Sequence, residues 1–161
     1  MTDNHSEADA VSAKQLHHIL TGNDFVKHDT IIELSEIHSF NDLDDLFGDR
    51  FYKIVFIRGE NQIGHWVLLS HVSRILVEYF DSTGNPPPDE LGEWMDSRGV
   101  ILEFSKVALQ HPDSFNCGRF VLARISSQPT PLQLFLDILR SSRKFTPDEM
   151  VRSLFNVDEE M

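Results

Sequence analysis

Cysteine is almost missing from this chain of 161 residues, because Cys117 is the only one. A single thiol cannot form an intramolecular disulfide, which excludes the disulfide-stapled scaffold of many small secreted proteins. Long apolar runs are missing too, since no stretch approaches the roughly 20 residues that a membrane span needs. Residues 1–10 have neither a basic start nor an apolar stretch, so no signal peptide is expected. These absences favour a reducing, intracellular location.

Positive charge is also scarce: 14 Lys and Arg stand against 26 Asp and Glu, and the net charge is −12. An acidic surface repels phosphates and anionic lipids, so neither nucleic acid nor a membrane is the expected partner. It suits a basic protein substrate, although acidity also promotes solubility. We expect residues 1–10 to be disordered and residues 11–161 to form a single domain with one core.

The pattern of apolar residues predicts helices and a small sheet. Three strands at 52–58, 64–70 and 74–80, with tight links, are typical of an antiparallel meander. Helices are expected at about 10–20 and at 40–47, the second capped by Asn41 and ended by Gly48. The proline-rich run 81–89 cannot be regular structure. Further elements are a helix at 91–97, a strand at 100–106, a helix from Cys117, and two helices with capping boxes at Thr130/Gln133 and Thr146/Glu149.

These elements predict an α+β fold, with a central, mostly antiparallel sheet flanked by helices. The segment CGRFVLARIS is mostly apolar, so its helix is expected to pack centrally. Cys117 would then lie at the N-terminus of a central helix.

Three polar residues are candidates for chemistry, and each has a structural alternative. A lone histidine in an apolar strand, such as His65, is more often structural. Asp81 at a strand end commonly bonds to nearby backbone, and a cysteine such as Cys117 is usually buried and inert. Together they are more specific, because a thiol nucleophile needs a base within reach and that base needs an orienting acid. His65 begins one strand and Asp81 ends the next, so an antiparallel pair places them at the same end.

The residues around Cys117 fit a nucleophile. Asn116 is a plausible helix cap, so the sulfur would lie in the first turn, where backbone N–H groups and the helix dipole favour a thiolate. Gly118 leaves space for a substrate backbone, and we expect both Asn116 and Gly118, which flank the cysteine, to contact the substrate. Gln110 begins the polar loop before the cysteine, and its amide and the Cys117 N–H would form a pair of oxyanion donors.

The order His, acid, Gln, Cys, carried by GHWVLL, YFDSTG, Q-x6-C and NCGRF, resembles the adenovirus-type maturation proteases. These share a clan with the SUMO and ubiquitin-like deconjugating proteases, and the resemblance covers roughly residues 50–125. Papain-like enzymes run Cys before His and are not matched.

The resemblance implies a role for each matched residue. His65 would be the general base and then the acid, Asp81 would orient it, and Gln110 would support the oxyanion. Cys117 would form a thioester acyl-enzyme. Trp66 would line a narrow channel for small residues of the Gly-Gly type, although a half-buried strand aromatic is an equally good interpretation.

No cofactor is expected. The adenovirus enzymes use DNA and a peptide as cofactors, but this acidic chain has no basic patch for DNA. Its only cysteine would be the nucleophile, which excludes a disulfide-linked peptide. A metal is not expected either, because adjacent His17 and His18 point to different faces of a helix and no zinc pattern is present.

Three functions are left open. The main prediction is a cysteine endopeptidase that cuts after small residues and matures viral capsid or polyprotein precursors, in the host cytoplasm or nucleus or inside a virion. A deconjugase that removes ubiquitin-like modifiers would use the same chemistry. A non-catalytic interaction domain that keeps the fold is disfavoured, because all four active-site residues are present.

Overall fold

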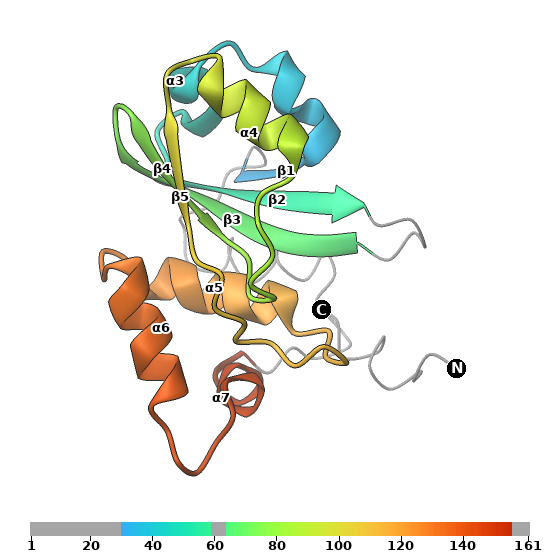
Figure 1. The fold of residues 1–161 in the computed structure, drawn as a ribbon, viewed down its shortest axis with the longest axis vertical. Coiled ribbons are helices and arrows are strands. Elements are labelled where there is room, and N and C mark those ends of the chain that lie inside the picture. Colours follow the sequence, from blue (N-terminus) through green and yellow to red (C-terminus); the bar gives the residue numbers. More distant parts are fainter. Residues whose placement is uncertain (1–29, 59–63, 156–161) are drawn as a thin grey trace.

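The structure, a computed structural model, describes residues 30–58 and 64–155 of the chain. A five-stranded sheet with the order β1-β2-β3-β4-β5 lies between two layers of helices (Figure 1). The fold is α+β, as predicted, and Cys117 begins α5. The predicted helix at 10–20 and the disorder at 1–10 lie outside the described residues. The elements are β1 (Ile31–Glu33), the 3-10 helix η2 (Leu34–Ser39), α3 (Leu43–Phe47), β2 (Tyr52–Arg58), β3 (Gly64–Ser73), β4 (Leu76–Phe80), α4 (Asp89–Asp96), β5 (Ile101–Phe104), α5 (Cys117–Ser127), α6 (Leu132–Arg140) and α7 (Pro147–Leu154).

The centre of the sheet is the antiparallel meander β2-β3-β4 that the sequence predicts. One detail of the prediction is wrong: β3 continues to Ser73, and β4 begins at Leu76 rather than Arg74. A register shift between His71 and Ser73 accounts for the difference, because it lets the hairpin continue past the expected turn.

The two edge strands are parallel to their neighbours, which the sequence did not indicate. β1 pairs with β2, and β5 pairs with β4. A parallel pair needs a crossover connection, and the segment from Asp81 through α4 provides it for β5. Asp81 is therefore the first residue of a crossover that leaves the sheet at the end of β4.

Alternation along the strands divides the core into two halves. Trp66, Leu68 and Phe80 pack against α5, while Val67 and Leu69 belong to the cluster on the side of α4. In Figure 1, α5, α6 and α7 cover one face of the sheet and α3 and α4 the other. Helix α5 is buried from Cys117 through Arg124, so it is the central helix of its layer.

A buried ion pair connects the far end of α5 to the sheet. The Arg124 guanidinium donates from Nη2 to Glu78 Oε1 at 2.6 Å and from Nε to Oε2 at 2.9 Å. Its Nη1 donates to the Thr130 carbonyl at 2.7 Å and to Ser127 Oγ at 3.0 Å. The two charged side chains are 1% and 5% exposed. This pair fixes α5 on β4, and therefore helps to set where Cys117 lies at the other end of the helix.

The helix caps agree with the sequence in part. Gly48 ends α3 with φ +57°, as expected, but Asp42 rather than Asn41 supplies the cap by accepting from Asp45 N–H. The Asn41 N–H donates to the Asp45 carboxylate at 2.9 Å. The adjacent aspartate is the better cap here, because its charged oxygen forms the stronger hydrogen bond.

Of the two predicted capping boxes, only the one that begins α7 is formed. Thr146 and Glu149 exchange bonds there, with Pro147 in the first position. Helix α6 has Pro131 at its N-cap and no side-chain cap. Gln133 bonds to Asp137 instead, at 3.0 Å. The prediction fails because α6 begins one residue later than expected, so that Gln133 is its second residue and Thr130 lies before the N-cap.

Replacing Arg124 by methionine should destabilise the fold strongly. The change leaves the Glu78 carboxylate buried without its cation, which typically costs about 3–5 kcal/mol. Urea unfolding followed by circular dichroism measures the loss. Arg140→Met, at an exposed position of α6, is the matched control and should change the free energy of unfolding by less than about 0.5 kcal/mol. Equal stability of the two variants would contradict a structural role for the ion pair.

Candidate active site

The unequal lengths of β3 and β4 bring His65 and Asp81 together. Pairing of the two strands reaches only as far as Leu68 opposite Phe80, so β3 extends past the end of β4. Continuing that register puts Asp81 opposite Val67, on the same face as His65. His65 Nε2 and Asp81 Oδ1 are 2.6 Å apart. The juxtaposition predicted from the strand order is confirmed.

The Asp81 carboxylate is held by the turn that follows it. Its Oδ1 also accepts hydrogen bonds from Thr83 N–H at 2.8 Å and from Thr83 Oγ at 2.6 Å. Gly84 closes the turn onto the Asp81 carbonyl at 3.0 Å, with φ +79°, and a Cβ there would come within 2.7 Å of the Lys106 carbonyl. The Asp81 side chain is only 4% exposed. The carboxylate is thus oriented by its own backbone turn and directed at His65.

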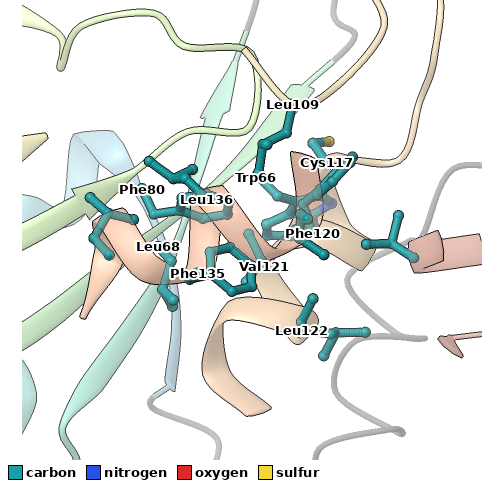
Figure 2. Close-up of a cluster of buried hydrophobic side chains, with 14 of the residues drawn as sticks. Trp66, Leu68, Phe80, Leu109, Cys117, Phe120, Val121, Leu122, Phe135 and Leu136 are labelled. Atoms are coloured by element: carbon teal, nitrogen blue, oxygen red, sulfur yellow. The ribbon is translucent and has the colours of Figure 1, made fainter. Parts of the chain in front are cut away.

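Cys117 is the second group that interacts with the His65 ring, and this interaction raises the pKa of the imidazole. Because Nε2 is engaged with Asp81, Nδ1 is the nitrogen left for the sulfur. The cysteine is 8% exposed. Figure 2 shows it at one end of the apolar cluster, close to Trp66 and Leu109. Three side chains from β3, the end of β4 and the start of α5 therefore form one row, in which His65 interacts with both Asp81 and Cys117.

The surroundings of His65 favour its protonated form. Burial lowers the pKa of the imidazole, but its hydrogen bond with Asp81 and its electrostatic interactions with Asp81 and Cys117 outweigh burial and raise the pKa to about 10. The ring is consequently an imidazolium at neutral pH. This is the charge state that a thiolate–imidazolium pair requires.

Gln110 is held in one orientation by the residues around it. Its Oε1 accepts from Ser82 Oγ at 2.6 Å, and its Nε2 donates to the Ser114 carbonyl at 2.7 Å. The Ser82 carbonyl in turn accepts from the backbone N–H groups of Leu109 and Gln110. Since an amide nitrogen carries two hydrogens, a second N–H remains on Gln110 beyond the bond to Ser114. The side chain is 8% exposed, and its position before Cys117 fits an oxyanion donor.

Asn116 stands at the N-cap of α5 but does not cap it, so the predicted side-chain cap is wrong. Its Nδ2 donates to Asp148 Oδ1 at 2.9 Å, and its Oδ1 accepts from Arg119 Nη1 at 3.1 Å. Bonds to charged partners outcompete a neutral cap. Gly118 is buried as the second residue of α5. A substrate-binding role for Asn116 and Gly118 stays a prediction.

Trp66, the residue after His65, packs against the aromatic ring of Phe56. The Phe56 and Trp66 rings have centroids 4.6 Å apart. Phe56 also covers Gly64, where a Cβ would lie 1.5 Å from the ring. Trp66 is 6% exposed and shares the apolar cluster of Cys117. It is more deeply buried than the half-buried strand aromatic considered from the sequence, and its channel-lining role stays a prediction.

A cavity of about 370 Å³ opens beside His65 and Asp81. It is concave and mostly apolar, as ligand-binding cavities usually are. Its other lining residues are Ile57, Tyr79, Thr83, Asn85, Pro86 and Pro88. Within residues 30–58 and 64–155, no group of three metal-ligating side chains occurs, and no helix there could span a membrane.

The sequence did not single out three residues that orient the site: Ser82, Thr83 and Asp148. Thr83 had a local signal, since an aspartate at a turn often accepts from the backbone two residues on. Ser82 acts on Gln110, 28 residues away, and Asp148 acts on Asn116, 32 residues away. No pattern in the local sequence predicts either of these contacts.

Comparison with known proteins gives a result at the level of fold. No protein-family model matches the sequence, and no curated protein matches it. Two crystal structures of ASFV pS273R protease are similar. One has a TM-score of 0.58 at 13% identity, covering 94% of this chain and 68% of that chain. The selenomethionine form has a TM-score of 0.57 at 16% identity, covering 93% and 68%. The chain therefore has the fold of these proteases.

Asp81→Asn should lower the pKa of His65. The folded-state pKa of about 10 lies above the ordinary value of 6.5, so protonation stabilises the fold fully below about pH 6.5, and this stabilisation is lost as the pH rises through about 10. Removing the carboxylate charge should move the titration down by roughly one to three pH units. NMR of the labelled imidazole measures it.

The control for this titration is Asp96→Asn, which removes the same charge at an exposed position of α4. It should leave the His65 titration unchanged. An Asp81→Asn protein whose His65 titrates as in the wild type would contradict the assigned contact.

Gly64→Ala should destabilise the protein by about 1–3 kcal/mol, because the added methyl group must displace the Phe56 ring. Gly92→Ala is the contrasting control. It lies in α4 with nothing within 4 Å of its Cβ, so it should stabilise by roughly 0.5–1 kcal/mol. Thermal unfolding of both variants tests the pair, and a neutral Gly64→Ala would show that Phe56 moves away freely.

Proposed function

We propose that the chain is a cysteine endopeptidase with Cys117 as nucleophile, His65 as base and Asp81 as the orienting acid. One observation carries the proposal: His65 Nε2 lies 2.6 Å from Asp81 Oδ1, and the same ring interacts with Cys117. A thiol, an imidazole and a carboxylate in a row are the parts that acyl transfer by a cysteine needs. The likeness to structures named as proteases supports it.

At the start of the reaction, the Cys117 thiol has transferred its proton to His65. The thiolate attacks the scissile carbonyl, and the carbonyl π electrons move to the oxygen. His65 then gives its proton to the leaving amine as the C–N bond breaks, which leaves a thioester on Cys117. Water attacks the thioester with His65 as base, and the acid product leaves as the thiol is restored.

Gln110 and the start of α5 would stabilise the oxyanion. First-turn amides of a helix have no partner within that helix, so the Cys117 N–H is one donor. The Gln110 Nε2–H that is not bonded to Ser114 is the other. Because Ser82 and Ser114 fix the Gln110 amide, little reorganisation is needed when the negative charge develops.

The substrate we propose is a protein precursor cut after small residues at Gly-Gly-like sites. The resemblance in GHWVLL supports this, because Trp66 would narrow the approach to Cys117. The solved neighbours are named as proteases of ASFV, which supports a viral maturation role, in the host cytoplasm or nucleus or in a virion. The net charge of −12 suits a basic precursor.

Cys117→Ala should abolish cleavage of Gly-Gly-containing precursor peptides, by at least about 10³-fold, because no other group in the row can form the acyl-enzyme. Chromatography of the peptide products measures it. Ser126→Ala, an exposed change in the same helix, is the control and should cleave as the wild type does. Cleavage that survives in Cys117→Ala would contradict the proposal.

A panel of ubiquitin-like modifiers with C-terminal electrophiles separates the remaining alternatives. Precursor cleavage without labelling by any modifier is the result expected for a maturation protease. Labelling of Cys117 would assign the chain to the deconjugases. Failure of both reactions would leave the non-catalytic interaction domain.

A further inference from the structure

Asp148 reaches from α7 to the loop that precedes Cys117. It is the second residue of α7, and its carboxylate accepts three hydrogen bonds from that loop. Oδ2 accepts from His111 N–H at 2.7 Å. Oδ1 accepts from Ser114 Oγ at 2.6 Å and from Asn116 Nδ2 at 2.9 Å. One side chain thus holds the loop at three points over residues 111–116.

We propose that Asp148 is a positioning residue of the active site, which fixes the 110–117 loop so that both oxyanion donors point to the same place. The proposal rests on the proposed function for its effect on turnover. Asp148 itself would touch neither the substrate nor the reacting atoms. It acts through two series of hydrogen bonds, one leading to Gln110 and one leading to the start of α5.

The first series of hydrogen bonds passes through Ser114. The Ser114 hydroxyl is bonded to Asp148, and the Ser114 carbonyl accepts from Gln110 Nε2 at 2.7 Å. A shift of Ser114 would therefore turn the Gln110 amide. Ser82 holds the other end of that amide through Oε1. Asp148 consequently completes the set of contacts that orients Gln110.

The second series of hydrogen bonds passes through Asn116, the residue directly before Cys117. Its amide lies between Asp148 and Arg119, at 2.9 Å and 3.1 Å. Arg119 Nε also donates to the carbonyl of Phe155 at 3.0 Å, at the end of α7. The start of α5 is therefore connected to both ends of α7, which sets the direction of the Cys117 N–H.

Hydrogen bonds, rather than close packing, carry this connection. A cavity of about 550 Å³ lies between the loop and the first turn of α7. His111 and Asp113 are exposed at its rim. Bonds to a carboxylate are about twice as strong as neutral ones, so three of them can order a loop that packs incompletely. Helix α7 does not depend on these three bonds for its own position, because its capping box and the buried Val151 also hold it.

Asp148→Asn is the direct test. An asparagine must turn its NH₂ toward either the His111 N–H or the Asn116 Nδ2, so a donor meets a donor in both orientations. We expect kcat on a Gly-Gly peptide to fall about 10- to 100-fold while KM changes less than about threefold, since removing one oxyanion donor costs about 10²–10³-fold. Ser114→Ala breaks one of the three bonds and keeps the carbonyl, so its kcat should fall less.

Glu149→Gln is the matched control. It removes the same charge one residue further on, at an exposed position, and glutamine can still accept in the capping box. Its kcat should equal that of the wild type. An Asp148→Asn protein with kcat within twofold of the wild type, or a fall of the same size in Glu149→Gln, would overturn the inference.

Two further measurements separate positioning from loss of fold and from failure of the proposed function. Alkylation of Cys117 by iodoacetamide uses no oxyanion donor, so its rate should stay within twofold in Asp148→Asn. Hydrogen exchange of the His111 amide should become at least tenfold faster, with core amides unchanged. If the wild type shows no Cys117-dependent turnover, the proposed function has failed, and unchanged exchange at His111 would then overturn the inference by itself.

Discussion

Packing of α5 against one face of the sheet is the constraint on which the rest of the site depends. The helix is buried along its first eight residues, with Cys117 at one end and Arg124 at the other. Its apolar side chains share a cluster with Trp66, Leu68 and Phe80 from the strands (Figure 2). The bidentate bond from Arg124 to Glu78 stops the helix from sliding along β4. The sulfur is therefore positioned by a buried element, not by a loop.

The electrostatics of the site follow from where the charges are buried. Asp81 is almost fully enclosed, and Thr83 supplies two further donors to the same carboxylate oxygen that faces His65. The interactions of His65 with Asp81 and Cys117 more than offset the effect of burial on the pKa of the imidazole. Hydrogen bonds within the protein thus hold Asp81 and His65 in place, as a preorganised site requires.

The C-terminal helices complete the site from a distance in the sequence. Helix α7 contributes Asp148 to the loop before Cys117 and the Phe155 carbonyl to Arg119. Helix α6 begins beside Arg124, which bonds to the Thr130 carbonyl. Residues after α5 therefore matter for the site, although the resemblance seen in the sequence covers only about residues 50–125.

The sequence alone determined the elements whose pattern is local. Strand β2 and the start of α5 were predicted at their observed residues, because β-branched runs and an apolar helix after a turn are local signals. The meeting of His65 and Asp81 followed from strand order. Only the tertiary structure decided the parallel edge strands, the partners of Asn116 and the contacts of Asp148. Most of these contacts join segments more than 20 residues apart, and packing of the core brings the segments together. Such packing produces no periodic pattern in the sequence of either segment.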